Sequence, residues 1–397
     1  MELNRSEPWL LSLGFIENAS SLFGATNATE PTSVAPGALL KGGLLLAIIL
    51  LAISGNLMVL LAVFLNANLR TATNCLIVNL ALADLLLGAS VLPFSAALEI
   101  LDKQWYFGQI FCHVWAATDV LCCTASINSL CVISVDRYIG VTRPLTYSSV
   151  VTHRRALVAC VLVWLLSAVI SVGPLLGWRE PPPADPFVCE VTKQTGYVVF
   201  SVSFSFYIPT LVILVLYYRI YRAATRQTKF LRTGVKTIKG EPGQLTLRVH
   251  TPSMAGDDAH RSSAAGVQGR LAKFKRQKKA AKTLGIVVGV FIICWFPFFF
   301  LLPLGTLCEQ CTVPPLLFDF CFWTGYFNSC LNPFIYASTS REYNRAFRAI
   351  VRCQWSKPSF VPPDSHHASS GSTGHRTSRP GVSSLGRSTE GSDSEVR

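Results

Sequence analysis

Long apolar stretches, separated by shorter polar ones, dominate the pattern of this chain. Each stretch holds the roughly 20 residues that a helix needs to cross about 30 Å of hydrocarbon. In lipid a spanning segment has to satisfy its own backbone hydrogen bonds, so each stretch predicts a helix rather than an isolated strand. We therefore expect an all-α membrane protein, a seven-transmembrane helix bundle with spans at about 42–66, 74–99, 110–138, 155–177, 197–221, 281–304 and 315–337.

The positions of Lys and Arg predict how the bundle is oriented. The segments after spans 1, 3 and 5 carry an excess of basic residues, whereas the alternate loops do not. Basic loops stay in the cytoplasm, so we expect the N-terminus to be extracellular. Composition agrees with an integral membrane protein, because 50% of the 397 residues are hydrophobic and mean hydropathy is +0.41. The net charge of +13 then indicates membrane lipid and an acidic cytoplasmic partner rather than nucleic acid.

The polar segments predict four regions. We expect a disordered extracellular tail at 1–40, the seven-transmembrane domain at 41–340 with a long cytoplasmic loop at about 224–272, an amphipathic surface helix at 341–353, and a disordered cytoplasmic tail at 354–397. The first region holds three Asn-x-Ser/Thr sequons, which predict glycosylation at Asn4, Asn18 and Asn27. Cys353 follows the surface helix and is a palmitoylation candidate, with an unmodified thiol as the alternative.

One carboxylate in span 3 has no obvious reason to be in a membrane. Asp119 lies in the otherwise apolar or small-residue stretch VWAATDVLCC, and the membrane interior offers no Lys or Arg to pair with it. A protonated structural acid is one reading, but ionisable groups inside spans are costly and usually functional. Asp119 follows Cys112 by seven residues, about 10 Å of helix, so extracellular water can reach it. The position predicts a counter-ion for a cation that arrives from outside.

Neighbouring spans carry side chains that suit a small amphipathic cation. Trp295, Phe298 and Phe299 share one face of span 6, and Phe322 and Tyr326 share one face of span 7. Aromatic faces attract an ammonium group. Core packing is the usual role of each such stripe, but the unpaired acid favours a binding site. In span 5, two serines one helical turn apart could bond paired hydroxyls on a ring; these are Ser201 and Ser205.

Short motifs in nearly every span resemble those of the rhodopsin-like (class A) G-protein-coupled receptors. They include GN in span 1, NLALAD in span 2, DRY in span 3, CWFP in span 6 and NPFIY in span 7. The resemblance covers about residues 42–353. Within the aminergic group the chain is most similar to the alpha-1 adrenergic receptors, through WAATDVLCCTASI, DRYIGVTRPL, SVGPLLGW, LTLRVH, KKAAKTLGIVVG and GYFNSCLNP.

The resemblance implies a receptor for adrenaline or noradrenaline that activates Gq-type G proteins, phospholipase C and calcium signalling. Receptor kinases and arrestin are further implied partners. Asp119 would pair with the amine, Ser201 and Ser205 with the catechol hydroxyls, and Phe298 and Phe299 with the ring. Phe322, where beta-type receptors carry Asn, points to an alpha type. The ligand-binding residues implied are Asp119, Val120, Cys123, Ser201, Ser205, Trp295, Phe298, Phe299, Phe322 and Tyr326.

Two further groups of residues gain roles from the resemblance. A sodium ion would lie among Asp84, Ser126, Asn328, Ser329 and Asn332, although a network bridged by water is a close alternative. No other metal and no cofactor is expected. A disulfide would join Cys112 to Cys189, and Cys308 could pair with Cys311 in a small second ring or stay reduced.

Receptor switching would use residues near the cytoplasmic ends of the spans: Asp136, Arg137, Tyr138, Leu145, Tyr217, Gln277 and Tyr336. Gln277 departs from the alpha-1 pattern, which reads REKKAAKTL where this chain reads RQKKAAKTL. The acid that would pair with Arg137 in the inactive receptor is missing. We therefore expect a somewhat raised basal activity.

Two alternatives stay open on the sequence. The ligand could be another biogenic amine, such as octopamine, histamine, dopamine or serotonin. An amine transporter ranks lower, because the seven spans contain no inverted repeat. The sequence does not bring a nucleophile, a base and an oxyanion donor together, so we do not expect an enzyme.

Overall fold

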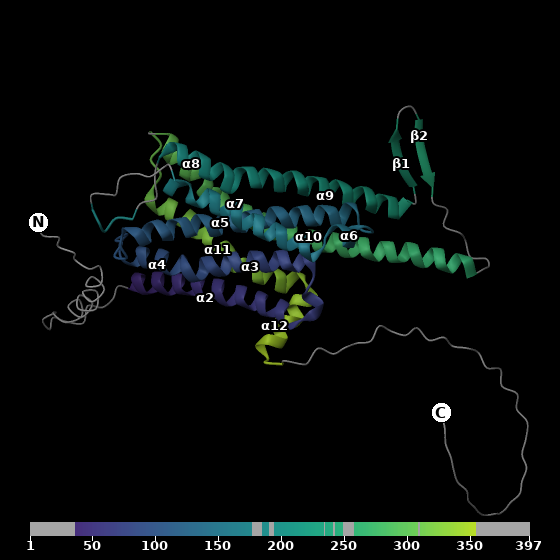
Figure 1. The fold of residues 1–397 in the computed structure, drawn as a ribbon, viewed down its shortest axis with the longest axis horizontal. Helices are drawn as coiled ribbons and strands as arrows, with labels where there is room; N and C mark the ends of the chain where they lie inside the picture. Colours follow the sequence, from purple (N-terminus) through teal and green to yellow (C-terminus); the bar gives the residue numbers. More distant parts are fainter. Residues whose placement is uncertain are drawn as a thin grey trace, which may run out of the picture. The chain divides into compact units, whose positions relative to one another are not determined.

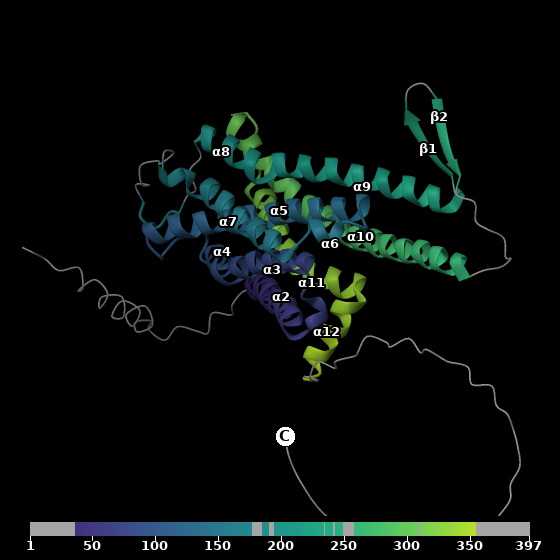
Figure 2. The same cartoon turned by 45° about the vertical axis from the view of Figure 1, so that its right-hand side comes forward.

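The computed structural model describes residues 36–176, 185–189, 194–233, 235–240, 243–248, 258–308 and 310–354. Two of the expected regions fall wholly or largely outside these ranges. The three sequon asparagines Asn4, Asn18 and Asn27 precede them, and the tail after 354 follows them. The unit described below is Met1–Trp355, within which long helices pack side by side (Figures 1 and 2).

The first four expected spans correspond to helices α2, α3 with α4, α5 and α7. Helix α2 covers Pro36–Leu65 and is followed by the short η1 at Ala67–Leu69. The second span consists of α3 (Ala72–Ser90) and α4 (Leu92–Ile100), which meet beside Pro93, a residue without a backbone N–H to donate. Helix α5 covers Gln109–Thr142 and is followed by α6 at Tyr147–Val150; α7 covers His153–Leu176.

The fifth span is a helix interrupted by one wide turn. It begins as α8 (Thr195–Val202), passes through a π-helical segment η2 (Ser203–Tyr207) and continues as α9 (Ile208–Thr233). In η2 the Ile208 N–H donates to the Ser203 carbonyl five residues earlier. Pro209 follows at once and cannot donate to the Ser205 carbonyl, which favours the wide turn at this point.

The remaining spans are α10 and α11. Helix α10 covers Asp258–Leu307, with Pro297 and Pro303 inside it, and α11 covers Pro315–Thr339. The surface helix α12 follows at Arg341–Val351. Between α9 and α10 lies an antiparallel hairpin of β1 (Val235–Gly240) and β2 (Gly243–Arg248), which pairs Val235 with Arg248. Regular structure thus enters part of the long loop that the sequence assigns to about 224–272.

Burial follows the pattern of a membrane protein. Large apolar side chains of α2, α7 and α9, such as Leu50, Leu165 and Leu211, are exposed on the outside of the bundle. Polar Asn56, Asp84 and Asn128 are buried inside it. The fold is therefore a helical bundle with an apolar outer surface, as the sequence predicts.

By length and composition alone, six helices in the described part of the chain could cross a membrane. The seventh, α11, packs against α10 and α2 as part of the same bundle. Its apolar character is lowered by Asn328, Ser329 and Asn332, which are all buried in the interior rather than directed to lipid. The polar residues that interrupt span 7 in the sequence are thus its inward face.

Candidate functional site

Asp119 lies on α5 and lines an internal cavity at one end of the bundle, which we call the cavity end. Its carboxylate accepts a hydrogen bond of 3.5 Å from the Cys123 thiol. The Tyr326 hydroxyl approaches it without reaching hydrogen-bond geometry. No ion pair reaches Asp119 from any residue that the structure describes. The carboxylate is thus available to a cation within the cavity.

The cavity has a volume of about 350 Å³, which is in the range of small-molecule sites. Its walls come from α4, α5, α8, η2, α10 and α11. Nine of the ten side chains that the sequence assigns to ligand binding line it: Asp119, Val120, Cys123, Ser201, Ser205, Trp295, Phe298, Phe299 and Phe322. The tenth, Tyr326, is fully buried and lies behind this wall, with its ring centroid 4.4 Å from that of Phe322.

The two serines come from different kinds of helical turn. Ser201 lies in α8, and Ser205 lies in the wide turn of η2. Ser205 is buried and its hydroxyl accepts a hydrogen bond of 2.9 Å from Thr124 of α5. Thr124, which also lines the cavity, was not among the expected residues. The Thr124 hydroxyl fixes Ser205 but leaves the Ser205 proton free for another acceptor.

Aromatic rings form the part of the cavity next to α10. Trp295 is buried, and its ring centroid lies 5.8 Å from that of Phe298 and 5.6 Å from that of Phe299. Phe299 in turn stacks on Phe206 at 4.5 Å. The Trp295 indole fits against α11 only because position 325 is Gly, since a Cβ there would lie 2.6 Å from the indole. Gly325 therefore determines where Trp295 rests.

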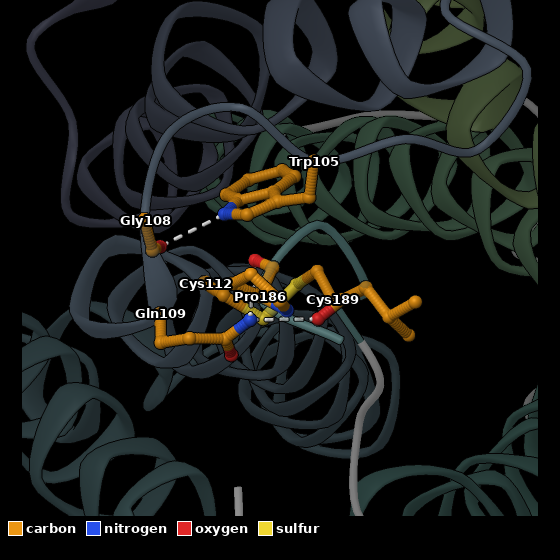
Figure 3. The surroundings of a disulfide bond; sticks show 7 residues. Trp105, Gly108, Gln109, Cys112, Pro186 and Cys189 are labelled. Carbon is orange, nitrogen blue, oxygen red and sulfur yellow. Dashed lines mark hydrogen bonds between the residues drawn. A yellow bond between two sulfur atoms is a disulfide. The ribbon is translucent and has the colours of Figure 1, made fainter. Parts of the chain in front are cut away.

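A disulfide lies at the start of α5, at the cavity end (Figure 3). Cys112, in the first turn of α5, is bonded to Cys189, with their Cα atoms 5.7 Å apart. Gln109 donates from its amide to the Pro186 and Val188 carbonyls, at 2.9 and 2.8 Å. The Trp105 backbone N–H donates to the Phe187 carbonyl at 2.7 Å. Together these bonds hold residues 185–189 against the start of α5.

A second disulfide lies in the segment between α10 and α11. Cys308 and Cys311 are bonded to each other, with their Cα atoms 5.2 Å apart. The structure therefore contains both pairs that the sequence suggests, and the alternative of free thiols at Cys308 and Cys311 does not apply to it.

The charged residues at the cavity end were not predicted from the sequence. Lys41 of α2, Glu99 of α4, Lys103 and Asp319 of α11 form a continuous chain of ion pairs. Glu99, Lys103 and Asp319 also line the cavity. The spacing of Glu99 and Lys103, four apart with opposite charges, was a usable signal for one of these pairs, but the contact to Asp319 crosses 216 positions in sequence.

Asp84 forms the centre of a polar network in the middle of the bundle. It accepts hydrogen bonds from Ser126 at 3.2 Å, Ser329 at 3.0 Å and Asn332 at 2.7 Å. Two buried amide oxygens of the neighbouring residues Asn328 and Asn332 have no hydrogen-bond partner. Hydrogen bonds thus join Asp84 to three of the other four residues assigned to sodium, with Asn328 next to Ser329 on α11, and these oxygens with the Asp84 carboxylate suit a hard cation. Among the described residues, no group of three or more His, Cys, Asp or Glu side chains is arranged to hold a metal ion.

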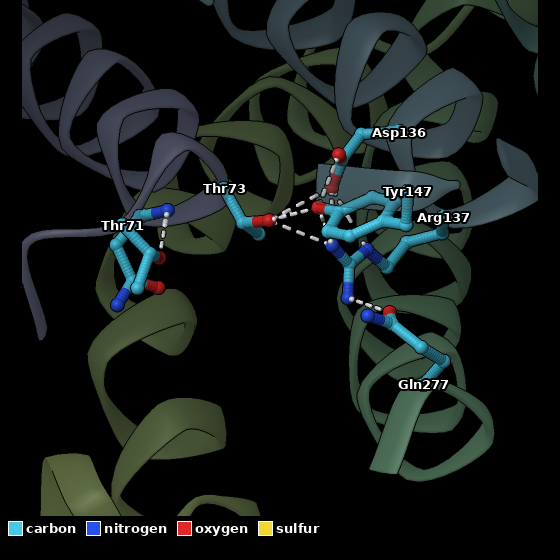
Figure 4. A network of polar contacts seen from close by, with 7 residues as sticks. Thr71, Thr73, Asp136, Arg137, Tyr147 and Gln277 are labelled. Atoms are coloured by element: carbon cyan, nitrogen blue, oxygen red, sulfur yellow. Dashed lines mark hydrogen bonds and ion pairs between the residues drawn. The ribbon is translucent and has the colours of Figure 1, made fainter. Parts of the chain in front are cut away.

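At the opposite end of the bundle, Arg137 forms a compact buried network (Figure 4). Its guanidinium pairs with Asp136 and donates to the Thr73 hydroxyl at 2.7 Å and the Tyr147 hydroxyl at 2.9 Å. It also donates to the Gln277 amide oxygen at 3.2 Å, which links α5 to α10. Thr73 and Tyr147 were not predicted from the sequence. Burial raises the pKa of Tyr147 to about 12, so this hydroxyl keeps its proton.

The other expected switch residues have different surroundings. The hydroxyls of Tyr217 and Tyr336 are buried without a hydrogen-bond partner. Tyr138 is half-buried, and Leu145 is exposed. Cys353 is an exposed free cysteine just after α12, whose Tyr343 and Phe347 are buried. Its lipidation stays a prediction.

Comparison with known proteins identifies this architecture. Residues 55–336 match the family described as 7 transmembrane receptor (rhodopsin family). The chain is 53% identical to the human alpha-1D adrenergic receptor over 79% of its own length and 56% of that receptor. It is 48% identical to the rat alpha-1A adrenergic receptor over 85% of its own length and 73% of that receptor. The chain thus spans a little over half of the alpha-1D receptors that it matches.

The class defined by the fold and the site is therefore a multi-pass membrane receptor, not an enzyme. The chain belongs to the rhodopsin family of seven-transmembrane receptors, and the relatives named above are alpha-1 adrenergic receptors. The resemblance read from the sequence is confirmed.

Proposed function

We propose that this receptor binds a catecholamine, adrenaline or noradrenaline, in the cavity that contains Asp119. The observation that carries the proposal is an unpaired carboxylate on the wall of a largely apolar cavity, with two serine hydroxyls on another wall. The ligand ammonium pairs with Asp119, and the aromatic rings around it add cation–π attraction. The names of the alpha-1 adrenergic relatives support the same ligand class.

The two ends of a catecholamine match two sides of the cavity. With its amine on Asp119 of α5, the catechol ring extends toward Ser201 and Ser205 and donates to or accepts from their hydroxyls. Phe298 and Phe299 of α10 then lie against the ring. Ser205 is held in place by Thr124, so it is already oriented when the ligand arrives.

Ligand binding would shift an existing equilibrium between an inactive and an active arrangement of the helices. Contraction around the ligand presses on Trp295, and Pro297, two residues further along α10, removes a backbone hydrogen bond from that helix. The opposite end of α10 then moves outward and releases Arg137 from Gln277. Arg137, Tyr138 and Leu145, with the exposed basic residues Lys273 and Lys278 of α10, would form the surface for a Gq-type G protein that activates phospholipase C and calcium release.

The remaining partners and the location are part of the same proposal. The receptor would lie in the plasma membrane with its N-terminus and cavity end outside, which agrees with the sequons before α2, the disulfides and the basic residues at the Arg137 end. Receptor kinases and arrestin would bind the cytoplasmic face. Palmitoylation would attach Cys353 to the membrane.

The Asp84 network is proposed as a site for sodium. Asp84, Ser126 and Ser329 with the free amide oxygens of Asn328 and Asn332 would hold the ion, which would balance the charge of the buried carboxylate. Water could occupy the same oxygens. A sodium titration of agonist affinity separates the two, because only an ion site gives a sodium-dependent affinity that Asp84→Asn abolishes.

A calcium assay in cells with a panel of biogenic amines tests the proposed ligand. Noradrenaline and adrenaline should give the most potent responses, and Asp119→Ala should remove them without reducing surface expression. A stronger response to octopamine, histamine, dopamine or serotonin would reassign the ligand. Unchanged noradrenaline affinity in Asp119→Ala would refute the amine site itself.

A further inference from the structure

The ion pairs at the cavity end place a lysine ammonium at a fixed point of the ligand cavity. Lys103 pairs with Glu99 on one side and with Asp319, at 2.9 Å, on the other. Glu99 is the buried centre of the chain and is also bonded to Lys41 at 2.7 Å. The four charges therefore compensate one another and join α2, α4 and α11.

Lys103 and Lys41 differ in one respect that matters for a ligand. Lys103 lines the cavity together with Glu99 and Asp319, whereas Lys41 does not. Asp319 precedes Tyr326 by seven residues on α11, which is about 10 Å along the helix. Because Tyr326 lies beside Asp119, the cavity has charged groups at two levels separated by about this distance.

Several contacts hold the Lys103 ammonium in position. The Lys103 backbone N–H donates to the Leu98 carbonyl at 2.8 Å, and the backbone at Asp102 and Lys103 has positive φ angles of 50° and 66°, which make a tight turn. An ammonium group has three N–H donors. Among the residues that the structure describes, Glu99 and Asp319 take two of them. The third has no partner among those residues, and Lys103 lines the cavity.

The ammonium remains charged under all physiological conditions. Burial lowers the pKa of Lys103, but the hydrogen bonds to Glu99 and Asp319 more than offset it and bring the pKa above its ordinary value. A hydrogen bond from a charged donor is stronger than one between neutral groups. The half-exposed position reduces this advantage without removing it.

We propose that Lys103 determines specificity among amine ligands by donating its third N–H to a hydrogen-bond acceptor on the amine substituent. This inference rests on the proposed function, which places the ammonium on Asp119 and the ring at the serines. A substituent on the nitrogen then points away from the serines, toward α4 and α11. The preferred class is an N-substituted arylalkylamine with a carbonyl, ether or carboxylate oxygen about 10 Å from the nitrogen.

Two matched ligands test this proposal. Both are noradrenaline derivatives with the same long N-alkyl substituent, one ending in a carboxamide and the other in a hydrocarbon group of the same size. Their affinities are measured by displacement of tritiated noradrenaline from membranes that contain the full chain. The readout is the ratio of the two affinities, because a general effect on folding changes both ligands equally and leaves their ratio unchanged.

In the unmodified receptor the carboxamide ligand should bind more tightly, and Lys103→Met should reduce the ratio by about three- to tenfold. Lys103→Arg, which keeps a charged donor, should retain most of the preference. Lys41→Met is the matched control: it removes the other lysine on Glu99 and should leave the ratio unchanged. An unchanged ratio in Lys103→Met, or an equal fall in Lys41→Met, would overturn the proposal.

The same binding measurements distinguish a failure of this inference from a failure of the proposed function. If the hydrocarbon ligand and noradrenaline bind, and Asp119→Asn abolishes both, the amine site stands whatever Lys103 does. If neither binds to the unmodified receptor, the proposed function fails and the inference fails with it.

Discussion

Arg137 of α5 donates a hydrogen bond of 3.2 Å to the neutral amide oxygen of Gln277 on α10. The link between these two helices is therefore present without an opposing charge. The guanidinium is buried and has Asp136, Thr73 and Tyr147 as its other partners. The contact to α10 is accordingly the weakest and the easiest to release.

Substitution of Gln277 by Glu should lower basal signalling. A carboxylate at this position forms a charge-assisted bond with Arg137, worth about 1 kcal/mol more than the amide at a partly exposed site. A two-state equilibrium then shifts about fivefold toward the inactive arrangement. Inositol phosphate output without agonist, normalised to receptor number, measures the shift. Output equal to that of the unmodified receptor would show that Gln277 does not set basal activity.

Gly140 should be intolerant of a side chain for a related reason. A Cβ at this position would lie 2.6 Å from the Gln277 amide oxygen, so Gly140→Ala displaces the amide from Arg137. We expect Gly140→Ala and Gln277→Ala each to raise basal output. The double substitution should raise it by less than the sum of the two, because both remove the same bond. Fully additive effects of the two substitutions would contradict this coupling.

Replacing Asp119 with Asn should reduce noradrenaline affinity by at least 100-fold. The carboxylate is the single unpaired charge that the described cavity wall offers to an ammonium, and loss of one partner of a desolvated ion pair typically costs about 3–5 kcal/mol. Saturation binding with a radioligand measures the effect, and surface labelling confirms expression. Thr118→Ala is the control and should bind normally, because this half-buried neighbour does not line the cavity and its hydroxyl bonds to the Val114 carbonyl of its own helix.

The two serines should contribute unequally to catechol recognition. Ser205 is buried and oriented by Thr124, whereas Ser201 is only partly buried at the cavity wall. We expect Ser205→Ala to lower the affinity for noradrenaline by about tenfold. The affinity for phenylethylamine, which has no ring hydroxyls, should fall by less than about twofold. Thr124→Val should reproduce part of the loss by freeing Ser205. An equal loss for both ligands would mean that the serine acts through packing alone.

Gly325→Ala should uncouple ligand binding from signalling. The methyl group would lie 2.6–2.9 Å from the Trp295 indole and force it away from α11. Because Trp295 is at the base of the cavity rather than at Asp119, we expect noradrenaline affinity to change by less than the maximal calcium response. Comparison of affinity and maximal response in the same cells is the measurement; proportional losses of both would indicate simple misfolding.

The sequence predicts the bundle well because an apolar run of membrane length is rarely anything but a spanning helix. It does not predict the wide turn at Ser203–Tyr207, since the same apolar pattern fits an uninterrupted helix. Asp119 was visible from the sequence because a lone acid stands out in an apolar segment. Lys103 and Asp319 were not, because charged residues near span ends are common and their contact depends on the packing of distant helices. Thr73 and Tyr147 were missed for the same reason.

The five-residue turn of η2 also constrains how this receptor can be re-engineered. In an ordinary α-helix each residue advances the chain by about 100°. A π turn holds one residue more than an α turn in about the same rotation. If substitutions rewound Ser203–Tyr207 as an ordinary α-helix of the same length, everything before it, Ser201 included, would rotate by about that angle relative to α9. A chimera that joins the outer part of this span to another receptor must therefore transplant the turn whole, or its hydroxyls will face lipid.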